Sequence, residues 1–241
     1  MRKEFTEVNW GYAIRNNIPW ISSFAAEFHG PDIRIYGDYE DDRPNDYIWS
    51  SIHLNEFTDE KMIYERASAL NAIFDGAMYV DIGTSYEPFW NRHIAFLDNG
   101  WAITNFEPNP LVEPFWQEYV DSTPKPPDDF VSKIIHKSRY DKSIREILLF
   151  LGVNGLSWIS LYAVLDTIKS EGWNDKAIIA KKVATAAELN LFGHTANNVA
   201  AIGPFARHGN KGQSPPDNPM PHKAAKELIL RILKKFIAAK L

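Results

Sequence analysis

The chain has 241 residues, of which 45% are hydrophobic and 24% are charged, a balance typical of a globular protein with a sizeable core. It contains no cysteine, which excludes disulfides, thiolate metal sites and cysteine nucleophiles. No apolar run approaches the roughly 20 residues that cross a bilayer. The first residues also lack the apolar core of a secretion signal. We therefore expect a cytoplasmic protein with no membrane partner.

The net charge of −5 conceals two regions of opposite sign. Residues 1–130 carry 9 basic and 23 acidic side chains, a net charge of −14. Residues 131–241 carry 17 basic and 8 acidic side chains, a net charge of +9. Such an asymmetry indicates either a region that binds a polyanion or two regions that attract one another.

The N-terminal region, residues 1–129, is predicted to be α+β. Apolar residues at helical spacing predict one helix, which Thr58 caps and which ends before Gly76. The helix is expected to pack on one face of a small antiparallel sheet. Segments rich in β-branched and aromatic residues predict the strands of this sheet at 33–36, 47–54, 77–82 and 101–106.

A proline-rich stretch at 107–129 separates this region from a C-terminal region, residues 130–241. Its six prolines fix φ and withhold backbone donors, so we expect neither a helix interior nor a central strand there. Beyond it, apolar residues recur at helical spacing, and the loops are short. This pattern predicts an all-α antiparallel bundle. Ser157 and Asn174 can cap two of its helices, and a lysine-rich amphipathic helix begins near His222.

The stretch 194–220 gathers polar groups between two of these helices, and loops held in this way commonly carry function. Cleavage of RNA without a metal needs a histidine-like group to move a proton and a fixed cation to stabilise phosphate charge. We assign these catalytic roles to His208 and Arg207, with Asn198 positioning one of them. The simpler interpretation is a glycine- and proline-rich connector with both groups solvated. The residues assigned to binding are His194, Thr195, Asn197 and Lys211.

Other familiar sites are absent from the sequence. It has no phosphate-binding P-loop, no dinucleotide fingerprint and no His-Glu-x-x-His motif, and its seven histidines are scattered. The acidic run 38–42 lacks the glycine and the closing glutamate of a calcium loop. We therefore expect no metal and no cofactor.

Three elements precede the last helix: Thr195-Ala-Asn-Asn198, Ala206-Arg-His-Gly209 and Pro215-Pro-Asp-Asn-Pro-Met220. With them, the portion from about 138 to 241 resembles uncharacterised bacterial proteins and, through these, the HEPN superfamily of helical bundles. The resemblance implies a metal-independent endoribonuclease that acts on RNA in a toxin–antitoxin or phage-defence system. It also implies a homodimer with facing active sites, and a protein antitoxin as a partner.

The arginine and histidine depart from the HEPN signature. In that signature four to six residues separate the two, whereas His208 follows Arg207 directly. The alternative is therefore a non-catalytic HEPN-like module that serves binding or assembly with a protein partner. A third class, an enzyme that acts on a small molecule through the tryptophan-rich N-terminal region, has no motif to support it.

Overall fold

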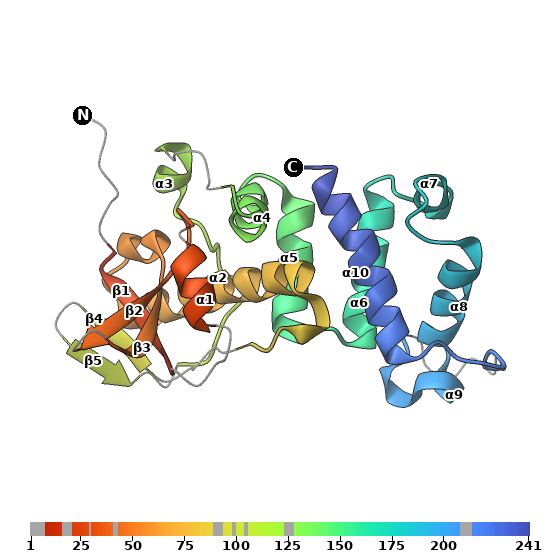
Figure 1. Ribbon diagram of the computed structural model, residues 1–241, viewed down its shortest axis with the longest axis horizontal. Helices are drawn as coiled ribbons and strands as arrows, with labels where there is room; N and C mark the ends of the chain where they lie inside the picture. Colours follow the sequence, from red (N-terminus) through yellow and green to blue (C-terminus); the bar gives the residue numbers. More distant parts are fainter. Residues whose placement is uncertain are drawn as a thin grey trace. The chain divides into compact units, whose positions relative to one another are not determined.

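The computed structural model (Figure 1) describes residues 8–15, 21–28, 30–40, 43–88, 94–97, 100–103, 106–122, 128–207 and 214–241. The chain divides into two compact units. Unit 1 contains residues 1–75 and 87–140, and unit 2 contains residues 76–86 and 141–241. Unit 1 combines a sheet with helices and unit 2 is helical, which confirms the predicted α+β class.

The elements of each unit follow one another in chain order. Unit 1 is built from β1 Trp10–Arg15, α1 Ile21–Glu27, β2 Arg34–Glu40, β3 Arg43–Ser50, the 3-10 helix η1 Ile52–Glu56, most of α2 Glu60–Asp81, β4 Ile94–Leu97, β5 Gly100–Ile103, α3 Gln117–Ser122 and α4 Phe130–Ser138. Unit 2 contains the end of α2, η2 Gly83–Ser85, α5 Lys142–Asn154, α6 Trp158–Ser170, α7 Asp175–Ala180, α8 Ala186–Ala196, α9 Val199–Ile202, η3 Gly203–Phe205 and α10 His222–Ala238. The helix α4, which the sequence assigned to the C-terminal region, thus belongs to unit 1.

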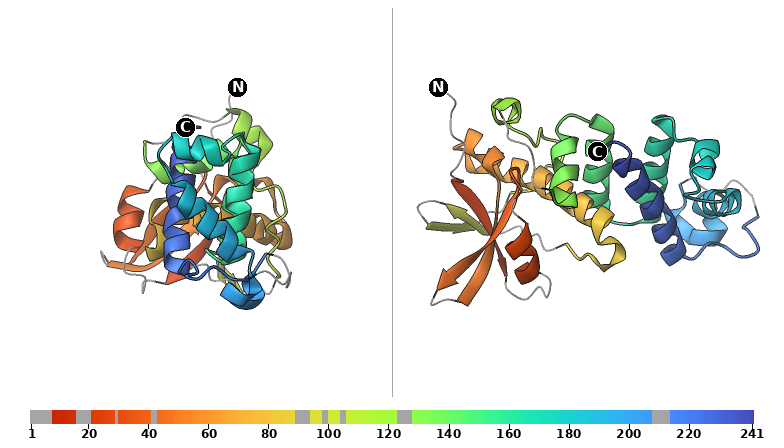
Figure 2. Two further views of the ribbon diagram at one scale, coloured as in Figure 1. Left: turned by 90° about the vertical axis from the view of Figure 1, so that its right-hand side faces the viewer. Right: turned by 45° about the horizontal axis from the view of Figure 1, so that its top comes forward.

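The described strands form one antiparallel sheet in the order β2-β3-β1-β4-β5. Tyr12 of β1 lies opposite Trp49 of β3, and their buried rings meet edge to face with centroids 6.1 Å apart. Tyr64 of α2 makes a similar contact with Tyr12 at 6.3 Å. The right-hand view of Figure 2 shows α2 beside the sheet, so the predicted packing of a helix on the sheet is confirmed. These three buried aromatic side chains belong to the core of unit 1.

The helix α2 differs from its prediction at both ends. Asp59, not Thr58, caps it, because the Asp59 carboxylate accepts a hydrogen bond from the Met62 N–H at 3.0 Å. The helix also continues through Gly76 to Asp81, so the strand predicted at 77–82 is wrong. A side chain at position 76 would collide with the backbone of Leu148 in α5. Gly76 therefore permits a close approach of two helices, where the sequence suggested a helix end.

The remaining predictions for unit 1 concern the proline-rich stretch. The short helix α3 occupies residues 117–122, which are free of proline. Tyr119 of this helix is buried, and its hydroxyl donates to the Pro31 carbonyl at 2.9 Å. The described residues of this stretch, 107–122 and 128–129, thus belong to unit 1.

Unit 2 is organised around α6, which contacts α5, α8 and α10 (Figure 1). The predicted caps are confirmed, because Ser157 accepts from the Ser160 N–H and Asn174 accepts from the Ala177 N–H. Thr185 caps α8 reciprocally with Glu188. α10 begins at His222 as predicted and buries a broad apolar stripe. None of the described helices is long and apolar enough to cross a membrane.

Candidate functional site

Three of the predicted site residues hold the segment 214–220 against the end of α8. His194 and Asn198 both donate a side-chain hydrogen bond to the Ser214 carbonyl, each at 3.0 Å. Thr195 is fully buried, and its hydroxyl accepts from the Met220 N–H at 3.0 Å. The side chains that the sequence assigned to binding or positioning here fix the chain's return from the loop to α10.

The two asparagines also lie at helix ends, Asn197 after α8 and Asn198 before α9. The Asn198 carboxamide oxygen accepts from the Ala200 N–H at 2.9 Å and so caps α9. Asn197 donates back to the Gly193 carbonyl at 2.8 Å, at the end of α8. Both atoms of the Asn198 side-chain amide thus serve local structure.

Arg207 lies apart from this group, on the surface of α6. Its guanidinium pairs with Asp166 at 2.9 Å and lies 4.2 Å from the ring centroid of Tyr162. Its backbone N–H donates to the Ala196 carbonyl at 3.0 Å, which returns the chain to the end of α8. The side chains of Arg207 and Asp166 are both 43% exposed. This leaves a half-exposed cation held in a defined position.

A row of stacked rings fixes the aromatic side chain beneath Arg207. Tyr162 stacks on Phe192, Phe192 on Trp158, and Trp158 on His222. The centroids lie between 5.2 and 6.1 Å apart, and the rings are within 28° of parallel. Tyr162 and Asp166, one turn apart on α6, were not recognised in the sequence as partners of Arg207. The i, i+4 spacing of an aromatic and an acidic residue was the available signal.

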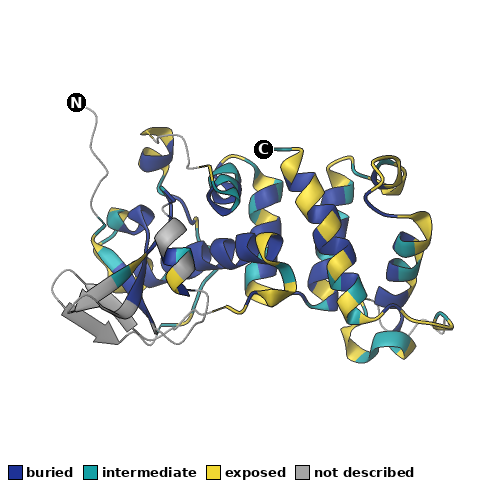
Figure 3. Cartoon of the chain, in the orientation of Figure 1, coloured by how far each residue is buried: buried dark blue, intermediate teal, exposed yellow. Residues whose placement is uncertain are grey.

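The segment α9–η3, residues 199–205, is apolar throughout and yet lies on the surface. Its sequence is Val-Ala-Ala-Ile-Gly-Pro-Phe, and none of the seven residues is buried. Figure 3 shows α9 in the colours of intermediate and exposed residues. Phe205 is 59% exposed. Gly203, with φ of 64°, ends α9 in a conformation that favours glycine.

Two predicted site residues, His208 and Lys211, lie outside the described residues. The catalytic roles assigned to Arg207, His208 and Asn198 therefore stay predictions. Among the described residues, no group of three His, Asp or Glu side chains is arranged to hold a metal ion.

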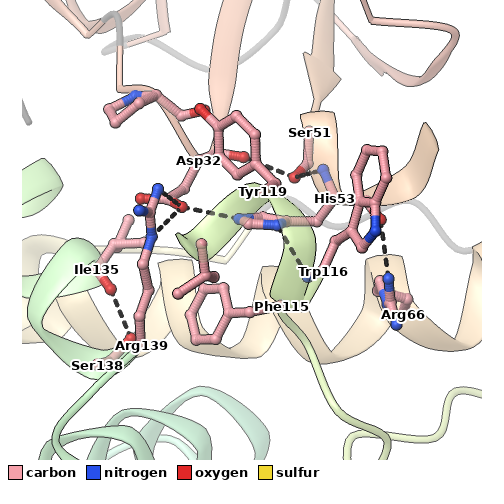
Figure 4. Close-up of polar contacts among 12 residues, drawn as sticks. Asp32, Ser51, His53, Arg66, Phe115, Trp116, Tyr119, Ile135, Ser138 and Arg139 are labelled. Carbon is pink, nitrogen blue, oxygen red and sulfur yellow. Dashed lines mark hydrogen bonds and ion pairs between the residues drawn. The ribbon is translucent and has the colours of Figure 1, made fainter. Parts of the chain in front are cut away.

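A second cluster of chemically capable groups lies inside unit 1, and no local pattern in the sequence predicts it (Figure 4). Asp32, His53 and Arg139 meet although they are 21 and 107 residues apart in the chain. His53 Nε2 lies 2.8 Å from Asp32 Oδ1, and Arg139 Nε donates to the same oxygen at 2.6 Å. The side chains of Asp32 and His53 are 1% and 0% exposed.

The protonation states of this cluster follow from its contacts. The backbone N–H of Trp116 donates to His53 Nδ1 at 3.0 Å, so the proton of the neutral ring is on Nε2 and is donated to Asp32. Burial lowers the pKa of His53 below its ordinary value, which agrees with a neutral ring. Burial alone would raise the pKa of Asp32, but the His53 hydrogen bond and the Arg139 charge outweigh burial and lower it. The cluster is an ion pair between Asp32 and Arg139 with a neutral histidine attached.

This cluster is closed to substrates. Both ring nitrogens of His53 are engaged, and the edges of Phe115 and Tyr119 pack on the ring at 5.2 and 5.1 Å. Ser51 donates to the Asp32 carbonyl at 2.6 Å, and Arg66 donates to the His53 carbonyl at 3.0 Å. The atom of a general base that accepts the proton must lie within hydrogen-bond reach of a substrate. The cluster therefore links η1, α4 and the segment before α3, and its role is structural.

Comparisons of the chain with protein-family models, with curated proteins and with solved structures give no match. The resemblance to HEPN bundles stays a prediction.

Proposed function

We propose that the protein is a non-catalytic binding and assembly module that pairs with a second copy of itself through the α9–η3 segment. The observation that carries this proposal is a run of seven consecutive apolar residues, 199–205, none of which is buried and of which Ala200, Pro204 and Phe205 are exposed. Contiguous apolar surface of this kind is characteristic of an interaction site.

The segment is held in a form suited to docking. Asn198 caps its first turn, and the bond from the Arg207 N–H to the Ala196 carbonyl closes it at the other end. A preorganised apolar surface binds with a smaller loss of conformational entropy than a chain that must order on binding. The position of Phe205 within the α9–η3 segment makes this residue the natural anchor of an interface.

The charges beside the segment favour a second copy as the partner. An interface around a two-fold axis must be complementary to itself. Arg207 and Asp166 supply one cation and one anion, both half-exposed. Around a two-fold axis, Arg207 of each copy can pair with Asp166 of the other, while Phe205 and Ile202 form the apolar centre. This arrangement resembles the usual anatomy of an interface, with an apolar core and a charged rim.

The proposal is tested by sedimentation equilibrium of the full chain between 1 and 200 µM. The wild type is expected to dimerise, and Phe205→Asp to weaken association by about 100-fold, because it introduces a charge from each copy into the apolar centre. Val153→Asp is the matched control, since Val153 is an exposed apolar residue of α5, outside the segment. A chain that stays monomeric at every concentration, or a Phe205→Asp variant that dimerises as well as the wild type, contradicts the proposal.

The second candidate function is the RNA-directed effector, a metal-independent ribonuclease. One observation favours it: the half-exposed guanidinium of Arg207 is preset by Asp166 and Tyr162 and immediately precedes His208 in the chain. Unit 2 also carries 14 basic and 9 acidic side chains, a net charge of +5. An arginine held in this way could stabilise charge on a phosphate.

The two functions are separated by an RNA cleavage assay in the presence of EDTA. If His208 is the general acid or base, His208→Ala lowers the cleavage rate by about 10² to 10⁴ while the melting temperature stays unchanged. RNA binding measured at 50 and 200 mM salt serves as the second readout. Replacing Lys223 and Lys226 by Gln is expected to reduce the magnitude of the slope of log K against log salt concentration by about 2. A wild-type chain that leaves RNA intact excludes the ribonuclease.

A further inference from the structure

A pocket of unit 2 lies between the end of α7 and the beginning of α8 and is not used by either proposed function. Its volume is about 450 Å³, within the range of small-molecule sites. Ile179, Val183, Ala184 and Ala186 contribute apolar surface. Lys182, Glu188 and Arg231 contribute charged groups.

Lys182 occupies a backbone conformation that normally selects glycine. Its φ is 55°, and among the described residues it is the one non-glycine residue with a positive φ. It follows the C-cap of α7, where the Lys182 N–H donates to the Ile179 carbonyl at 2.9 Å and the Val183 N–H donates to the Ile178 carbonyl at 3.2 Å. This is the Schellman arrangement, in which glycine is the usual residue. A lysine at this position carries backbone strain that glycine would avoid.

The other charged groups of the pocket neutralise one another. Arg231 pairs with Glu188 at 2.7 Å and donates from Nε to the Val183 carbonyl at 2.8 Å. The Thr185 N–H and then Arg231 hold the pKa of Glu188 below its ordinary value. With this pair neutral overall, Lys182 gives the pocket a net charge of +1. The pocket also lies at the N-terminal end of α8, where Glu188 supplies the negative charge that the helix dipole favours.

We propose that this pocket binds a small monocarboxylic acid with an apolar body. Lys182 pairs with its carboxylate, while Ile179 and Val183 contact the apolar body. Arg231 and Glu188 form a fixed wall that shapes the pocket without taking part in the charge balance. The site does not include α9–η3 and does not depend on the function proposed above.

The test is a titration of the ¹⁵N-labelled full chain with hexanoate, followed by the amide signals of residues 183–186. The uncharged analogue 1-hexanol and inorganic phosphate are titrated separately, because each carries only one half of the proposed recognition. Hexanoate is expected to shift these signals to saturation, and each of the other two probes to bind at least about tenfold more weakly, through loss of the charged contact or of the apolar one. No shift with hexanoate, or equal shifts with 1-hexanol, overturns the proposal.

Three variants, Lys182→Gln, Lys176→Gln and Lys182→Gly, test whether hexanoate binding depends on Lys182. Lys182→Gln is expected to weaken hexanoate binding by about tenfold. Lys176→Gln, which removes the same charge from α7 outside the pocket, is expected to leave hexanoate binding unchanged.

Lys182→Gly separates binding from folding. It is expected to lose hexanoate affinity to the same extent as Lys182→Gln and to raise the melting temperature by about 2 °C, because glycine relieves the backbone strain. A glycine variant that retains affinity, or that melts below the wild type, removes the reason for assigning Lys182 to a ligand.

Discussion

The two units use similar polar side chains in opposite ways. In unit 1, Asp32 and Arg139 pair where water has no access, with His53 attached. In unit 2, Asp166 and Arg207 form the same kind of pair at the surface, with both side chains half-exposed. An enclosed pair is costly to break and unavailable to a partner, whereas an exposed pair contributes little stability and can be exchanged. In this chain, burial more than residue type thus distinguishes charged side chains with a structural role from those that are candidates for binding.

The largest effect is expected from breaking the enclosed pair. Asp32→Ala leaves the Arg139 charge buried without a counterion, which should lower the free energy of unfolding by about 3–5 kcal/mol in urea titrations. Asp128→Ala is the control in the same unit, since Asp128 is exposed and pairs with Lys133 at 3.2 Å. The control should cost less than about 1 kcal/mol. Equal losses in the two variants would show that burial does not determine the strength of these pairs.

A buried hydrogen bond in unit 2 should behave like the interior of unit 1. Thr195→Val keeps the shape of the side chain but removes the acceptor of the Met220 N–H, at an expected cost of about 1–3 kcal/mol by thermal or urea unfolding. Thr167→Val is the control, because the Thr167 hydroxyl only adds a bond to the Ala163 carbonyl within α6. It should change stability by less than about 0.5 kcal/mol. A Thr195→Val variant as stable as the wild type is incompatible with a structural role for this residue.

The neutral state of His53 predicts how stability depends on pH. Since burial lowers its pKa from 6.5, the unfolded chain binds a proton more readily than the folded chain. Stability is therefore full above pH 6.5 and is lost as pH falls below it, by up to about 1.4 kcal/mol at pH 5.5 from this group. Unfolding of the wild type and of His53→Gln at pH 7.5 and 5.5 measures the contribution. An unchanged difference between the two pH values in the variant would mean that folding does not change the pKa of His53.

The smallest effect is expected at the exposed pair. Asp166→Ala should lower the free energy of unfolding by about 0.2–1 kcal/mol, and 1 M salt should remove most of that difference because it screens exposed charges. Its effect on self-association should be larger than its effect on stability if the pair is exchanged between copies. A loss of several kcal/mol would place Asp166 with the enclosed groups.

Features with a local physical cause could be predicted from the sequence. Ser157 and Asn174 were recognised as caps because their side-chain oxygens satisfy free N–H groups one turn ahead. The stripe of α10 followed from its apolar spacing. The prediction that the helix ends before Gly76 was wrong because glycine serves both at helix ends and where two helices approach closely. Only the close approach of Leu148 in the fold distinguishes these two roles.

The interior cluster could not be predicted at all. Asp32, His53 and Arg139 lie on three separate segments and show no spacing pattern, and only the fold brings them together. For the stretch 194–220, the sequence drew attention to the polar residues but could not assign their partners. The Ser214 carbonyl and the Met220 N–H, which His194, Asn198 and Thr195 bind, are backbone groups that every residue carries.

The anchoring of the chain at Arg207 and Ser214 has a consequence for protein engineering. The Arg207 N–H is bonded to Ala196, and the Ser214 carbonyl is bonded to His194 and Asn198, so both anchors attach to the same end of α8. Extra residues inserted between positions 207 and 214 replace none of the groups that make these bonds. Doubling the length of such a connection costs roughly 0.6 kcal/mol. The connection is thus a natural insertion point for an epitope tag or a fluorescent reporter that leaves the helices of unit 2 unchanged.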